Sequence, residues 1–137
     1  MNRPSSTSPT LLALTIAVVA MSMASRVDAQ FNETKSLLAT ARFRVLTPKT
    51  PRQKQIYAGL PAYKIERAHV HGTVIYVYKD EKAGIAYVGA KAEYDRYRKL
   101  CAQRHLDPDF FAAHEMDPMY AHRWYGAWSP KTVWRER

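Results

Sequence analysis

The chain has 137 residues, a formal net charge of +9 at pH 7 and one cysteine, Cys101. A single cysteine excludes an internal disulfide, so packing must stabilise the fold. The length suits one domain with a modest core, and the basic excess favours anionic partners through long-range attraction.

The first predicted element is a cleavable export signal. Arg3 precedes an uncharged apolar run, Leu11 to Ala24, and small residues stand before Gln30. This layout is typical of a secretory leader, and the run is shorter than the roughly 20 residues that a membrane span needs. We therefore expect cleavage after Ala29, no stable transmembrane span after cleavage, and an exported protein that is periplasmic or secreted. An uncleaved anchor is the alternative.

The rest of the chain divides into three parts. We expect an N-terminal arm or short helix over residues 30–50, and the sequence does not decide between the two. Residues 51–106 are predicted to form a core of a β-meander plus a helix, and residues 107–137 a short helix and a basic aromatic tail. At the start of the core, Thr50-Pro51 indicates a helix cap followed by a proline at the first helical position, and Gly59 ends this helix.

A β-hairpin is predicted around His71-Gly72. The flanking runs, 63–70 and 73–78, are rich in branched and aromatic residues. A two-residue turn of the favoured primed type needs positive φ at both positions, which Gly accepts freely and His better than most residues. The resulting cross-strand pairs are Ile65–Tyr78, Arg67–Tyr76, His69–Val74 and Val70–Thr73. A brief third strand over residues 85–89 completes the meander.

The clearest helix is predicted from Lys91 to His105. Its apolar stripe recurs at intervals of three and four residues: Tyr94, Tyr97, Leu100, Cys101 and Arg104. Asp107-Pro108 begins a short helix by the same cap-and-proline pattern, which Phe110, Phe111 and His114 would line and Pro118 would end. The predicted fold class is α+β: a small three-stranded antiparallel meander packed against one main helix, with short flanking helices.

The core resembles a group of small uncharacterised exported bacterial proteins. The shared order is Leu-Pro, Tyr-Lys, a turn glycine, Val-Tyr and Tyr-Val-Gly. It is carried by Leu60-Pro61, Tyr63-Lys64, Gly72, Val77-Tyr78 and Tyr87-Val88-Gly89. Where that group most often has Asn before the turn glycine, this chain has His71. The resemblance implies an exported module of a hairpin and a helix, and it implies no activity.

Histidines form the candidate metal site. His69 and His71 are separated by one residue, so on a continuous strand they point the same way and can share copper or zinc, with His114 as a third ligand. The alternative is one strand histidine and one turn histidine, with no cofactor. A periplasmic metal-binding protein is therefore the second functional hypothesis.

An enzyme is the third hypothesis, although no motif in the sequence assigns a catalytic residue. Histidines and carboxylates gather between His105 and His122, and Cys101 has basic neighbours in sequence that can activate a thiol. The alternative is that the carboxylates cap helices and that Cys101 is buried on the apolar stripe. No nucleophile, phosphate-loop or dinucleotide motif is present.

The basic aromatic tail is the candidate binding site. Trp and Arg anchor interfaces, and Trp also lies at membrane headgroups beside Lys and Arg. The residues concerned are Arg123, Trp124, Tyr125, Trp128, Lys131, Trp134 and Arg135. In the alternative, Trp124 and Trp128 fold back onto the sheet. The first functional hypothesis is a non-enzymatic, exported or envelope-associated module that contacts an anionic envelope component or another protein; export makes nucleic acid an unlikely partner.

Overall fold

A computed structural model of the chain describes residues 29–128. These residues belong to two units, divided between Lys35 and Ser36. In the first unit, residues 29–35 are helical, and the hydroxyl of Thr34 donates to the carbonyl oxygen of Gln30 over 3.0 Å. The apolar run of the predicted leader lies outside the described residues.

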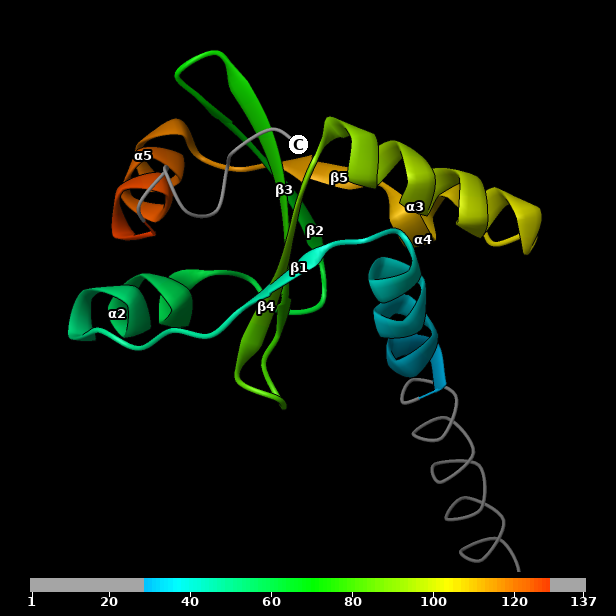
Figure 1. Cartoon of the computed structure of the whole chain (residues 1–137), viewed down its shortest axis with the longest axis horizontal. Coiled ribbons are helices and arrows are strands. Elements are labelled where there is room, and N and C mark those ends of the chain that lie inside the picture. Colours follow the sequence, from blue (N-terminus) through cyan, green and yellow to red (C-terminus); the bar gives the residue numbers. More distant parts are fainter. Residues whose placement is uncertain (1–28, 129–137) are drawn as a thin grey trace, which may run out of the picture. The chain divides into compact units, whose positions relative to one another are not determined.

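The second unit contains a five-stranded sheet with helices (Figure 1). It begins with helical residues 36–40, so the helical alternative is what this part of the predicted arm adopts. The elements that follow are β1 (Arg44–Leu46), α2 (Pro51–Gly59), β2 (Ile65–Val70), β3 (Thr73–Asp80), β4 (Ile85–Ala90), α3 (Lys91–Gln103), α4 (Pro108–Phe111), β5 (Ala113–Glu115) and α5 (Pro118–Ala127).

The sheet is mixed, with the strand order β1-β4-β3-β2-β5. Strands β2, β3 and β4 pair antiparallel as the sequence predicts, and β1 pairs antiparallel with β4. Strand β5 pairs parallel with β2. The α+β class is confirmed, whereas the finer prediction of a three-stranded sheet on one main helix is not, because the sheet has five strands and several helices pack on it. The two added edge strands are three residues each, too short to show the alternation that reveals a strand in a sequence.

The β2–β3 hairpin forms in the predicted register. All four predicted pairs are present, from Ile65 with Tyr78 to Val70 with Thr73. The φ angles of His71 and Gly72 are 50° and 75°, so both turn residues adopt the left-handed conformation of the primed turn. The alternation of side chains along β2 and β3 is therefore fixed, and each face of the sheet receives a defined set of residues.

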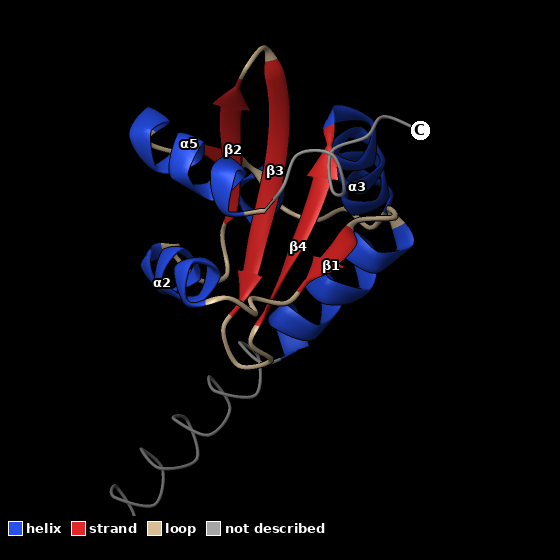
Figure 2. Cartoon of the chain, turned by 60° about the vertical axis from the view of Figure 1, so that its left-hand side comes forward, coloured by secondary structure: helices blue, strands red, loops and turns tan. Residues whose placement is uncertain are grey.

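Helices cover both faces of the sheet (Figure 2). On one face, α3 packs with residues 36–41 against a core that includes Tyr76, Tyr78 and Tyr97. On the other face, α2 and α5 pack against a core that includes Val77 and Trp124. Both cores lie in the second unit, and the sheet separates them.

Most helix boundaries follow their sequence signals, with one correction. Thr50 caps α2, and Asp107 caps α4 before its proline. Pro118 does not end the helix that begins at Pro108, because α4 stops at Phe111 and β5 follows. Pro118 instead begins α5, with Asp117 as the cap, so a helix occupies much of the predicted tail. His114 consequently lies on β5 and does not line α4.

Candidate functional site

Helices α2 and α5 form one rigid layer on the sheet. They lie side by side in both views (Figures 1 and 2). The side-chain amide of Gln53 on α2 donates to the carbonyl oxygen of Ala127 on α5 over 3.0 Å. The hydroxyl of Tyr120 donates to the carbonyl oxygen of Ile56, and burial raises the pKa of Tyr120 to about 12. These bonds therefore join Gln53 and Ile56 of α2 to the two ends of α5.

This layer, which we call the α2–α5 face, carries charges of one sign. Helix α2 contains Arg52 and Lys54, helix α5 contains Arg123, and neither helix contains an acidic residue. All three side chains are exposed and, within residues 29–128, none of them forms an ion pair. The nearest carboxylate in sequence, Asp117, accepts a hydrogen bond from the backbone of Tyr120 as the cap of α5. The exposed charges of the two helices are therefore all positive, and the carboxyls of Glu66 and Asp80, which act on Tyr120 and Tyr57, are buried beneath them.

Helix α3, on the opposite side of the sheet, carries charges of both signs. On α3, Lys91 pairs with Asp95 and Arg96 pairs with Glu93. Such exposed pairs contribute little to stability, but they cancel local charge. Arg98 and Lys99 on α3 form no ion pair within residues 29–128, so α2 and α5 differ from α3 in that neither contains an acidic residue, and not in having unpaired basic groups.

Some residues of the predicted aromatic site are exposed and others are buried. Arg123 is exposed and Tyr125 is half-buried, whereas Trp124 and Trp128 are 0% and 5% exposed. The two indole rings lie 4.2 Å apart in the core under α5. Both tryptophans thus fold back onto the sheet, which is the alternative weighed above, and in this structure they offer no surface to a partner. Lys131, Trp134 and Arg135 lie outside the described residues.

Sequence reasoning missed Arg52 and Lys54. They were interpreted only as part of a capped helix, although a helix with basic and no acidic residues is itself a charge signal. The proximity of Arg52 to α5 follows from tertiary packing: a Cβ atom added at Gly126 would lie 3.6 Å from Nη2 of Arg52. No local pattern in the sequence reveals that neighbourhood.

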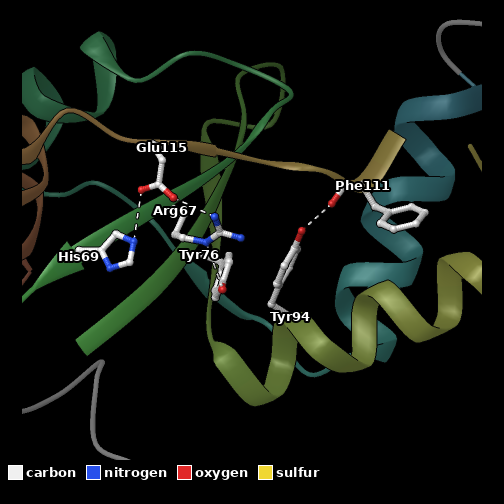
Figure 3. Close-up of polar contacts among 6 residues, drawn as sticks. All are labelled: Arg67, His69, Tyr76, Tyr94, Phe111 and Glu115. Atoms are coloured by element: carbon white, nitrogen blue, oxygen red, sulfur yellow. Dashed lines mark hydrogen bonds and ion pairs between the residues drawn. The ribbon is translucent and has the colours of Figure 1, made fainter. Parts of the chain in front are cut away.

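A second polar cluster lies on the opposite face of the sheet, at the β2–β5 edge (Figure 3). Nη1 of Arg67 lies 2.8 Å from Oε1 of Glu115, and Nε2 of His69 lies 3.2 Å from Oε2 of the same carboxylate. The hydrogen bond from Arg67 holds the pKa of Glu115 below its ordinary value, and His69 acts in the same direction. The same bond to Glu115 raises the pKa of Arg67, which keeps its guanidinium charged.

Two stacked tyrosines support this cluster. The rings of Tyr76 and Tyr94 are 4.0 Å apart and nearly parallel, and the guanidinium of Arg67 lies 5.4 Å from the Tyr76 ring centre. The hydroxyl of Tyr94 donates to the carbonyl oxygen of Phe111 over 2.9 Å (Figure 3). The arrangement holds an ion pair on a packed aromatic base, so a structural role accounts for each contact.

The three histidines of the predicted metal site do not come together. His69 contacts Glu115, whereas the ring of His71 lies against His122 and Tyr125 on α5. His114 neighbours Glu66 in the β2–β5 register and acts electrostatically on that buried carboxyl. His69 and His71 do not continue one strand, because β2 ends at Val70 and the left-handed φ of His71 breaks the strand alternation. The arrangement is the alternative of one strand histidine and one turn histidine.

Other candidate residues have structural positions. Within residues 29–128, no three His, Cys, Asp or Glu side chains are grouped so as to hold a metal ion. Asp107 and Asp117 cap helices, and Cys101 is 0% exposed on α3.

Among the described residues, no helix is both long enough and apolar enough to cross a membrane. Comparisons with protein-family models, curated proteins and solved structures found no match to this chain.

Proposed function

We propose that the protein is an exported, non-enzymatic binding module whose α2–α5 face contacts an anionic membrane surface through lipid phosphates. One observation carries the proposal: two helices that are joined by hydrogen bonds present Arg52, Lys54 and Arg123 without an acidic residue between them. Uncompensated basic groups near an anionic leaflet contribute about 1 kcal/mol each to binding. A rigid layer adds little ordering cost when it binds.

The chemistry of the side chains favours phosphate. A guanidinium offers paired N–H donors that match two phosphate oxygens, and two of the three exposed groups are arginines. The segment after α5 adds Lys131, Trp134 and Arg135 in sequence, residue types that favour the headgroup region. This segment lies outside the described residues, so the proposal rests on the α2–α5 face.

Vesicle binding tests the proposal. The untagged chain should bind vesicles that contain phosphatidylglycerol and not vesicles of phosphatidylcholine alone, and binding should weaken as salt rises because exposed charges are screened beyond about 8 to 10 Å. Replacement of Arg52, Lys54 and Arg123 together by Ala should lower the affinity roughly a hundredfold, at about 1 kcal/mol per residue.

The matched control removes the same amount of charge elsewhere. Lys82, Arg98 and Lys99 are exposed, lie outside α2 and α5, and form no ion pair within the described range. Their triple replacement by Ala should reduce binding far less. Equal losses in the two triple variants would show that net charge and not the α2–α5 face determines binding. Salt-independent binding, or none, would contradict the proposal altogether.

Export is tested on native material. Arg3 and the apolar run from Leu11 to Ala24 support a leader that is removed after Ala29. Mass spectrometry of the envelope or secreted fraction should find a mature chain that begins at Gln30. An intact Met1 terminus in the cytosol would contradict export, and nucleic acid would then compete with the anionic cytoplasmic leaflet as the partner of the basic groups.

A further inference from the structure

Two exposed histidines from distant parts of the chain lie close together, with their rings edge-on, at the end of the hairpin. The ring centres of His71 and His122 are 5.5 Å apart, and the planes meet at 82°. His71 belongs to the β2–β3 turn and His122 to α5. The ring of Tyr125, one helical turn after His122, lies 5.5 Å from that of His71 and flanks the pair on one side.

Both supporting elements are held in place. The turn is fixed by antiparallel pairing up to Val70 and Thr73, and by the left-handed φ angles of its two residues. Helix α5 is anchored by Ala121 and Trp124, each 0% exposed in the core. His122 and Arg123 lie between these two buried residues and are exposed. The two imidazoles are therefore positioned by the fold and not by a mobile loop.

The residue at position 71 is not the one that the turn favours. A primed turn before glycine is best served by Asn or Asp, which accept the left-handed conformation more readily than His. His71 has a φ of 50° and is exposed, and its ring contacts the rings of His122 and Tyr125. Asn or Asp at this position would suit the turn but would place no imidazole beside His122.

We infer that His71 and His122 form a two-imidazole site for a borderline divalent cation, Cu²⁺ before Zn²⁺. Imidazole suits these ions, and Cu²⁺ binds nitrogen sites more tightly than Zn²⁺. A separation of 5.5 Å between the ring centres leaves room for one ion that each imidazole binds through a nitrogen at about 2.0–2.1 Å. Water fills the remaining positions. The bound ion clips the hairpin turn to α5, and protons compete for both ligands.

This site differs from the trio predicted from the sequence. It shares only His71 with that trio, and its second ligand is His122 instead of His69 and His114. The two ligands lie far apart in the sequence. It is independent of the proposed membrane contact, because neither imidazole is one of the basic groups that carry that proposal. Failure of one proposal therefore leaves the other intact.

Electron paramagnetic resonance with Cu²⁺ as the probe tests the site directly. The untagged chain with one equivalent of Cu²⁺ should give a spectrum with hyperfine coupling to two imidazole nitrogens. His71→Asn and His122→Ala should each remove this signal. His71→Asn should also keep the fold, since Asn suits the turn, so a lost signal cannot be attributed to unfolding.

A matched control is available at His105. This histidine is exposed and has a φ of 57°, so His105→Asn repeats the chemistry of His71→Asn away from the site. The two-nitrogen signal should survive in His105→Asn and in His69→Ala. Loss of the signal in His69→Ala, or its persistence in both His71→Asn and His122→Ala, would overturn the inference.

Thermal unfolding provides a second readout. An ion that links the turn to α5 binds only the folded state, so Zn²⁺ in excess should raise the Tm of the native chain, by on the order of 4–8 °C for each 1 kcal/mol of linkage. His71→Asn and His122→Ala should show no such rise, whereas His105→Asn should show the full one. An equal rise in all variants, or none in the native chain together with no copper signal, would end the proposal.

Discussion

The ammonium group of Lys79 donates a hydrogen bond to the carbonyl oxygen of Leu60, at the C-terminal end of α2, over 3.1 Å. A second bond of 3.0 Å reaches the carbonyl oxygen of Tyr57, and the ammonium lies 4.6 Å from the Tyr57 ring centre. Lys79 is 3% exposed. The last carbonyls of a helix attract a cation, and the last turn of α2 contains no basic residue. Strand β3 therefore supplies this cation through Lys79.

Replacement of Lys79 by Met should therefore destabilise the fold strongly. Met keeps the length of the side chain but leaves buried carbonyls at the end of α2 without their donor, and we expect a loss of about 2–4 kcal/mol. Denaturant unfolding followed by circular dichroism measures it. The control is Lys82→Met, at an exposed turn position, which should change stability by less than about 0.5 kcal/mol. Similar values for both variants would refute the capping role of Lys79.

Lys79 also illustrates what the sequence hides. The alternation around Tyr78 predicted the hairpin register correctly, because turn chemistry and strand period are local properties. The same alternation places Lys79 on the face that α2 covers, but a lysine in a strand gives no sign that it is buried against a helix end. Trp124 is a similar case, since its burial depends on α5 packing across a sheet built from residues far away. Of the proposed basic face, only Arg123 was anticipated.

Gly89 should not tolerate a side chain. A Cβ atom there would lie 2.8 Å from the Cβ atom of Glu93 and 3.0 Å from Cε2 of Phe43, whose ring packs edge-on against Tyr97. Neither neighbour can move freely, because one is attached to α3 and the other is packed in the core. Gly89→Ala should therefore destabilise the fold by about 1–3 kcal/mol through overpacking. Urea unfolding gives the value.

The same substitution at Gly126 should stabilise the fold instead of destabilising it. A Cβ atom at this exposed position in α5 would meet only Nη2 of Arg52, at 3.6 Å, which is ordinary contact. Alanine favours a helix over glycine, so Gly126→Ala should stabilise the fold by up to about 1 kcal/mol. Two glycine-to-alanine changes that destabilised the chain equally would show that the packing around Gly89 is not as described.

The ion pair between Arg67 and Glu115 should make a small, pH-dependent contribution. The hydrogen bond from Arg67 lowers the folded-state pKa of Glu115 from its ordinary 4.5, so the contribution is present above that value and is lost as pH falls through the folded-state pKa. Because Glu115 is largely exposed, we expect less than about 1 kcal/mol at pH 7.

The variant Glu115→Gln tests this contribution. It should be slightly less stable than the native chain at pH 7, and the difference should shrink below pH 4.5 as the native carboxylate becomes protonated. Urea unfolding across this pH range measures the difference. A gap that is constant with pH would mean that the charge on Glu115 contributes nothing and that the loss reflects packing alone.

Cys101 is predicted to react with thiol reagents only when the chain opens. Its side chain is 0% exposed and lies on the buried stripe of α3 with Tyr94 and Tyr97. A thiolate must reach solvent to attack a reagent or another thiol. Modification by an aromatic disulfide reagent should therefore be slow in native buffer, become fast in denaturant, and slow further under conditions that stabilise the fold.

The same burial bears on association. An intermolecular disulfide through Cys101 requires α3 to leave the sheet. The native chain kept under oxidising conditions should therefore remain monomeric on a non-reducing gel. The variant Lys79→Met, once partly unfolded, should form a disulfide-linked dimer. Rapid labelling of the fully folded chain would show that Cys101 is accessible, and a redox role would then return to consideration.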